Sequence, residues 1–160
     1  MKTKQIIAAT VFGTTAMSAF SYIVSTLKGK NFKEPELLGE FIKVIAPTAD
    51  QETAEKAGWE SHYAIGLAFA GVMAEIWEHT PIKPSIASGA LLGAASGVAG
   101  VMGWTQIFKL ENEPAAEDKV NYYGHLILAH AIFGIGAAAG YKLFSDTIEP
   151  VTIEHEYIDA

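Results

Sequence analysis

The sequence contains no cysteine and no arginine among its 160 residues. Without cysteine the chain has no disulfide, no thiolate nucleophile and no cysteine-ligated zinc or iron–sulfur site. Without arginine, and with a formal net charge of −7, it also lacks the basic surface typical of nucleic-acid binding. Charged residues are scarce, at 18%, and they cluster between long apolar stretches. Because half of the residues are hydrophobic and the mean hydropathy is +0.22, the sequence predicts an integral protein of the lipid bilayer.

Four apolar stretches are long enough to cross a bilayer as helices, at about 1.5 Å of rise per residue and about 30 Å of hydrocarbon. They cover residues 5–27, 59–79, 85–108 and 120–144. Tryptophans lie near both ends of the second stretch, as expected for amphipathic rings at headgroup level. We therefore expect an all-α fold, a four-helix membrane bundle over residues 1–144, followed by an acidic tail over residues 145–160.

The first stretch allows a second interpretation. Residues 1–4 form a short basic start and residues 16–19 (AMSA) offer small residues for cleavage, which is the pattern of a signal peptide. The apolar region is long for a signal sequence, so we favour a first span. Lysines are most frequent in the loops after the first and third stretches, which favours a topology with both termini outside the cytoplasm.

A polar segment separates the first two stretches and contains a short amphipathic pattern over residues 35–46. Its apolar side chains recur at helical spacing, and prolines bound it on both sides. We expect a short helix that lies in the membrane interface or packs against the ends of the spans. Asp50 is placed to cap the helix that follows.

Glycines recur in the third and fourth stretches at spacings that suit close helix packing. Gly89, Gly93 and Gly97 fall four residues apart, and Gly136 and Gly140 repeat that spacing. Small residues at this spacing allow helix backbones to approach closely in lipid. We expect these faces to pack within one bundle, between copies of the chain in a homo-oligomer, or in a larger membrane complex.

A short repeat links the second and fourth stretches. Residues 62–66 (HYAIG) and 130–134 (HAIFG) share a His-x-x-x-Gly pattern, and both stretches cross the bilayer in the same direction in a four-span topology. The repeat suggests two helical hairpins related by duplication.

On these residues the chain resembles uncharacterised bacterial four-helix inner-membrane proteins, which are grouped as domains of unknown function. The resemblance rests on residues 13–18 (GTTAMS), 58–66 (GWESHYAIG) and 129–134 (AHAIFG), and it covers most of the chain except the tail. It implies a multi-pass protein of the bacterial inner (cytoplasmic) membrane. It implies no activity and no catalytic residues.

Histidines near the spans are the first candidates for chemistry, because burying ionisable groups in hydrocarbon costs on the order of a few kcal/mol unless they are paired or neutral. His62, His125 and His130 lie on the second and fourth stretches and could face one another across the bundle. Two facing imidazoles would suit haem b or a transition metal as a cofactor. We favour the simpler interpretation, in which the histidines hydrogen-bond neighbouring helices or lipid headgroups.

A second candidate lies at the other end of the second stretch. Glu75 and His79 are one helical turn apart and could share a metal cation, together with His155 of the tail. A solvated glutamate–histidine pair needs fewer assumptions. The pattern is neither a zinc-hydrolase nor a di-iron motif, and no nucleophile motif or phosphate-binding loop accompanies it, so no enzymatic activity is predicted.

Three functions are compatible with these features. The favoured one is a non-enzymatic structural or accessory membrane protein, because glycine-rich faces predominate over intramembrane charges. The second is a small transporter or channel, and the third is a haem- or metal-binding electron-transfer protein. A transporter would need a continuous polar path through Thr14, Thr15, Ser18, His62, His130 and Glu75.

Overall fold

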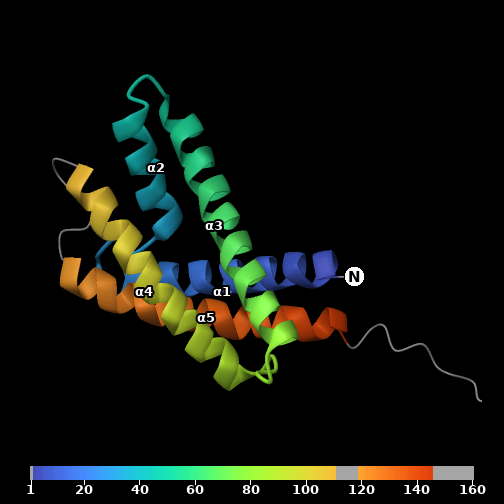
Figure 1. The fold of residues 1–160 in the computed structure, drawn as a ribbon. Helices are drawn as coiled ribbons and strands as arrows, with labels where there is room; N and C mark the ends of the chain where they lie inside the picture. The colour runs from blue at the N-terminus through green and yellow to red at the C-terminus, as the bar shows by residue number, and fades with distance from the viewer. Residues whose placement is uncertain (1, 111–118, 146–160) are drawn as a thin grey trace, which may run out of the picture.

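The structure is a computed structural model that describes residues 2–110 and 119–145. Within these ranges the regular structure is helical, which confirms the predicted all-α fold. The helices follow one another as α1 (Lys2–Lys28), α2 (Glu34–Ile45), α3 (Gln51–His79), α4 (Ile86–Leu110) and α5 (Lys119–Ser145) (Figure 1). The tail expected after residue 145 lies outside the described residues.

Three helices are long and apolar enough to cross a membrane, namely Thr3–Lys28, Ile86–Leu110 and Lys119–Ser145. They correspond to the first, third and fourth expected spans, although α4 begins one residue later than expected. The second expected span lies within α3, which is not among the three; polar side chains that include Glu60, His62 and Glu75 lower its mean hydropathy. By length and composition the chain is therefore a membrane protein with three candidate spans, where four were expected.

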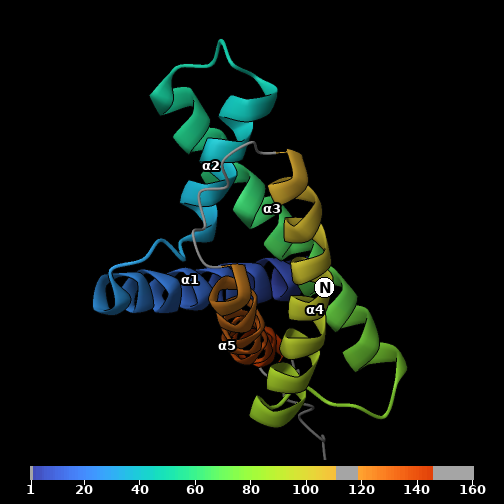
Figure 2. The same cartoon turned by 90° about the vertical axis from the view of Figure 1, so that its left-hand side faces the viewer.

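The helices cross one another more than they run side by side. α5 packs between α1 and α4, α1 also packs on α3, and α2 folds back along α3. Figure 2 shows α3 and α4 crossing α1 steeply, with α5 strongly foreshortened. α3 and α4 are consecutive, yet each packs mainly on other helices. Within the described residues this arrangement does not confirm two duplicated hairpins in an aligned four-helix bundle.

Local signals in the sequence set several helix ends. Gly29 follows α1 with a φ of 63°, the left-handed conformation that commonly ends a helix at glycine. Pro35 occupies the first turn of α2, where its missing N–H costs no helical hydrogen bond. Asp50 caps α3 as expected, because its carboxylate accepts a hydrogen bond of 2.8 Å from the backbone N–H of Thr53. That hydrogen bond also lowers the pKa of Asp50.

Glycines bring α4 into contact with the backbone of α5. A Cβ atom at Gly97 would lie 2.9 Å from the Cα atom of Ile127, and one at Gly89 or Gly93 would collide with a backbone carbonyl of α5. The three glycines therefore form one contact face, and a larger side chain there would force the two helices apart.

A second glycine face joins α5 to α1. A Cβ atom at Gly136 would lie 2.8 Å from the carbonyl oxygen of Phe12, and one at Gly140 would lie 2.6 Å from that of Ala8. α5 therefore packs closely against both other apolar helices, and it does so through different glycines.

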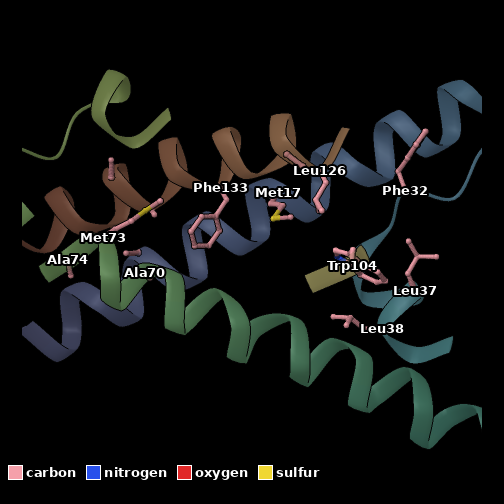
Figure 3. Packing of buried hydrophobic residues seen from close by; sticks show 14 of the residues in the cluster. Met17, Phe32, Leu37, Leu38, Ala70, Met73, Ala74, Trp104, Leu126 and Phe133 are labelled. Atoms are coloured by element: carbon pink, nitrogen blue, oxygen red, sulfur yellow. The ribbon is translucent and has the colours of Figure 1, made fainter. Parts of the chain in front are cut away.

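The buried apolar side chains form one continuous cluster where the helices meet. In Figure 3, Met17 of α1 and Phe133 of α5 lie near its middle. Met73 of α3 lies toward one end, and Leu37 of α2 and Trp104 of α4 lie together toward the other. The core thus draws on all five described helices.

α4 buries its glycine face together with Trp104 and Phe108, and it exposes large apolar side chains elsewhere. Ile86, Leu91, Val98 and Met102 are each between 53% and 74% exposed. An extended apolar surface of this kind needs a cover other than water, and the length and composition of α4 point to lipid.

Candidate binding cavity and its polar side chains

A row of hydroxyl side chains runs along the buried face of α1. Each of them is at most 6% exposed: Thr10, Thr14, Ser18, Ser21 and Ser25. Their spacing of three or four residues places them on one side of the helix. Because buried hydroxyl groups need hydrogen-bond partners, this hydroxyl row favours polar groups on the helices that pack against α1.

His62 of α3 meets the middle of the hydroxyl row. Its Nε2 atom lies 3.0 Å from the Ser18 hydroxyl oxygen, and its ring is 6% exposed. Tyr63 and Trp59 both pack against the imidazole edge-to-face. Thr15, on the neighbouring face of α1, forms a hydrogen bond of 3.0 Å with the Tyr63 hydroxyl. Polar contacts therefore join α3 to α1 at this level.

Ser21 joins Glu34 of α2 to His125 of α5. Its hydroxyl donates to Glu34 Oε1 at 3.0 Å and lies 2.9 Å from His125 Nε2. Because the single hydroxyl hydrogen is used toward Glu34, the histidine donates Nε2–H to the Ser21 oxygen. His125 Nε2 also lies 3.7 Å from Glu34 Oε1. The imidazole stacks on Phe20 and Phe32, with ring centroids 5.2 and 4.7 Å away.

Glu34 is an almost completely buried carboxyl group at the start of α2, outside the three candidate spans. It is 2% exposed, and its Oε2 atom has no hydrogen-bond partner in the described part of the chain. Burial raises its pKa to about 8, although hydrogen bonds from its own backbone N–H and from Ser21 act in the opposite direction. At neutral pH the protonated form predominates, so Oε2 can carry the hydrogen and donate it.

His130 of α5 is oriented by its own helix. Its Nδ1 atom lies 2.8 Å from the carbonyl oxygen of Leu126. Since a carbonyl only accepts, Nδ1 carries the hydrogen, and Nε2 of the neutral ring keeps its lone pair. The ring meets Phe69 edge-on at 5.6 Å, and a Cβ atom on Gly100 would lie 3.1 Å from its Cε1 atom.

A cavity of about 200 Å³ lies between α3 and α4, and residues of all five described helices line it. Four buried polar side chains reach it: Thr14, Glu34, His62 and His130. Thr14 Oγ1 has no hydrogen-bond partner among the described residues. The cavity is therefore a mostly apolar space with a few converging polar groups, which is the usual composition of a small-molecule site.

The walls of this cavity are apolar and partly aromatic, with Phe69, Trp104 and Phe133 among the lining residues. Three lining residues are exposed at the molecular surface, namely Ile65 of α3 and Ala99 and Gly103 of α4. These positions mark the mouth of the cavity. Since α3 and α4 each pack mainly on other helices, the mouth lies in the space between them.

The structure brings together only part of the set predicted from sequence. His62 and His130 reach the same cavity, whereas His125 belongs to the cluster around Ser21. The expected polar path likewise divides: Thr14, Ser18, His62 and His130 lie at the cavity or beside it, whereas Glu75 lies at an exposed position with His79.

Glu75 and His79 do form a pair. His79 Nδ1 lies 3.2 Å from Glu75 Oε2, and both side chains are more than 60% exposed. Pairs this exposed contribute little to stability. Across residues 2–110 and 119–145, no three histidine, aspartate or glutamate side chains are grouped so as to hold a metal ion. His155, the third expected ligand, lies outside the described residues.

Comparison of the chain with family models, with curated proteins and with solved structures found no match. The resemblance to uncharacterised bacterial inner-membrane proteins therefore remains a prediction.

Proposed function

We propose that this chain is a multi-pass integral membrane protein that binds a small, lipid-soluble molecule in the cavity between α3 and α4. One observation carries the proposal: a largely apolar cavity contains four buried polar side chains and has its mouth beside an exposed, apolar helix. Specific binding needs both features, because apolar walls supply affinity and a few polar groups orient the ligand.

The surroundings of the mouth favour access from lipid. Val98 and Met102 of α4 lie next to the mouth residues Ala99 and Gly103, and both are more than half exposed. α4 carries no charged side chain before Lys109. A ligand dissolved in the bilayer therefore reaches the cavity without crossing a charged surface.

In this proposal α3 is a fourth membrane segment over residues 59–79, as the sequence suggested. The polar groups that lower its hydropathy are partly accounted for by the protein interior, because His62 contacts the hydroxyl row of α1. The chain then has four spans in a bacterial inner membrane. A protein that binds a ligand without catalysing a reaction suits the accessory role favoured by the sequence.

Transport is a second candidate, and the hydroxyl row supports it. Beyond the cavity the row continues through Ser21 to Ser25, whose hydroxyl accepts a hydrogen bond of 2.9 Å from the backbone N–H of Phe32. Polar groups thus continue along α1 from the cavity toward the end of the helix. A transporter would move its substrate across sealed vesicles, whereas a binding protein would only retain it.

Haem or metal ligation has less support from the geometry. His62 Nε2 is used toward Ser18 and His125 Nε2 toward Ser21. Of the three Nε2 atoms, only that of His130 is left available at the cavity.

Native mass spectrometry of the detergent-purified protein tests the proposed function. We expect a stoichiometric small molecule that is carried from the host membrane. Gly103→Phe should abolish it, because Gly103 lines the mouth and a Cβ atom there meets nothing within 4 Å, so a phenyl ring can be added at the mouth without a backbone clash. Gly124→Phe is the matched control, since its Cβ atom also meets nothing within 4 Å and it does not line the cavity. A wild-type protein without any bound small molecule would contradict the proposal.

A further inference from the structure

The size of the cavity limits what can occupy it. An engineered protein cavity of about 150 Å³ holds one benzene molecule. A cavity of about 200 Å³ therefore has room for one substituted six-membered ring. Phe69, Trp104 and Phe133 in its walls suit a flat, aromatic or conjugated ring.

Two of the polar groups, Glu34 and Thr14, are separated along the axis of α1, and His62 meets Ser18 between them. Ser21, which holds Glu34, is seven residues from Thr14, and this corresponds to about 10 Å along α1. Thr14 and His130 both line the cavity. A six-membered ring that carries oxygen atoms at opposite positions spans a length similar to this separation once a hydrogen bond of about 2.8 Å is added at each oxygen.

The hydrogen-bonding capacity at each end suits such a ring. The Glu34 carboxyl can donate or accept through Oε2, and the Thr14 hydroxyl has no other partner in the described residues. A carbonyl oxygen would accept from these two groups. A ring hydroxyl would donate to the lone pair of His130 Nε2. The site therefore satisfies both a quinone and the corresponding quinol.

We propose that the ligand is a lipid-soluble quinone or quinol, with one ring oxygen at Glu34 and the other at Thr14 and His130. Its tail leaves through the mouth between Ala99 and Ile65 into the lipid. This inference rests on the proposed function and adds the chemical class of the ligand. It involves binding only, with no electron transfer.

A fatty acid, which also has one polar head group and an apolar tail, fits the site less well than a quinone. Its carboxylate would need a cation or several donors, and no lysine is present among the residues that line the cavity. The nearest acidic group is Glu34, which would repel a second carboxylate once it ionised.

Quenching of Trp104 fluorescence by a short-chain alkyl benzoquinone tests this inference. The other two tryptophans are replaced by Trp59→Phe and Trp77→Phe, so that only the tryptophan in the cavity wall reports. We expect saturable quenching that Gly103→Phe abolishes and Gly124→Phe leaves intact. The alkylbenzene of equal chain length, which lacks both oxygens, should compete at least about tenfold less well, because it forgoes two hydrogen bonds.

Thr14→Val removes one hydrogen bond while nearly preserving side-chain volume. It should weaken the quinone about three- to tenfold and leave competition by the alkylbenzene unchanged. Equal affinities for the quinone and the alkylbenzene would overturn the inference, as would quenching that Gly103→Phe does not affect. If the quinone fails to bind while mass spectrometry still detects a molecule that Gly103→Phe displaces, the proposed function stands and the quinone assignment falls.

Discussion

The buried carboxyl group of Glu34 should make the stability of the protein depend on pH. Its ordinary pKa of 4.5 is raised by burial to about 8 in the folded protein. Between these values the folded protein keeps a proton that the unfolded chain releases. The contribution of Glu34 to stability therefore decreases as the pH rises from about 4.5 to about 8, and it is constant on either side of that window.

The size of this effect follows from the two pKa values. Each pH unit between them corresponds to about 1.4 kcal/mol, so the upper bound is roughly 5 kcal/mol. For a chain of this length, about 1 kcal/mol shifts the thermal midpoint by about 2–4 °C. His125, which lies 3.7 Å from Glu34, reduces the effect if it becomes protonated when the carboxyl ionises. Relative to a variant whose side chain at this position does not titrate, a decrease of roughly 5–15 °C between about pH 5 and about pH 8 is therefore expected.

Glu34→Gln removes the titrating proton but keeps an oxygen that can accept from Ser21. Thermal unfolding of the detergent-solubilised protein, followed by tryptophan fluorescence, should show that the difference between this variant and wild type grows with pH. Glu40→Gln is the control, because Glu40 is an exposed carboxylate on the same helix. Parallel pH profiles for wild type and Glu34→Gln would refute the burial argument, whatever their absolute midpoints.

Three further substitutions test helix packing, the N-cap of α3 and a buried hydrogen bond. Gly134→Ala should reduce the free energy of unfolding by about 1–3 kcal/mol and lower the thermal midpoint, because the added Cβ atom collides with the backbone of α4. Gly124→Ala, whose Cβ atom meets nothing within 4 Å, should not lower the midpoint. Asp50→Ala should cost about 1 kcal/mol in chemical denaturation, and Asp50→Asn should retain most of the cap; equal losses would contradict the capping role. Ser18→Ala should cost about 1–3 kcal/mol, since it leaves a buried ring nitrogen of His62 unpaired, and a neutral result would mean that water replaces the hydroxyl.

Much of the fold follows from hydropathy and local signals. Long apolar stretches predict α1, α4 and α5, and Asp50 marks the start of α3 that the structure contains. The spacing of Gly89, Gly93 and Gly97 indicates a contact face, but it does not say which helix lies there. That choice depends on the backbone of α5 around His130 and Gly134, which the spacing within α4 alone does not reveal.

Glu34 is the main residue that sequence reasoning missed. Burial of an ionisable group is predicted most readily inside an apolar stretch, whereas Glu34 belongs to the polar segment that joins α1 to α3. It is buried only because α2 folds back along α3 and places it against Ser21. The hydroxyl row of α1 was predicted only in part, through Thr14 and Ser18, although its spacing of three or four residues is a signal that the sequence contains.

The measurement that tests the central claim most directly is where the mouth of the cavity lies relative to the bilayer. Because the chain has no cysteine, Ala99→Cys can carry a single nitroxide spin label, and Lys83→Cys in the connection between α3 and α4 provides a control outside the helices. In protein reconstituted into lipid vesicles, we expect the label at Ala99 to collide more with oxygen than with a water-soluble nickel chelate, and the label at Lys83 to show the reverse. A label at Ala99 that prefers the nickel chelate, as at Lys83, would place the mouth in water and contradict a cavity that is filled from the membrane.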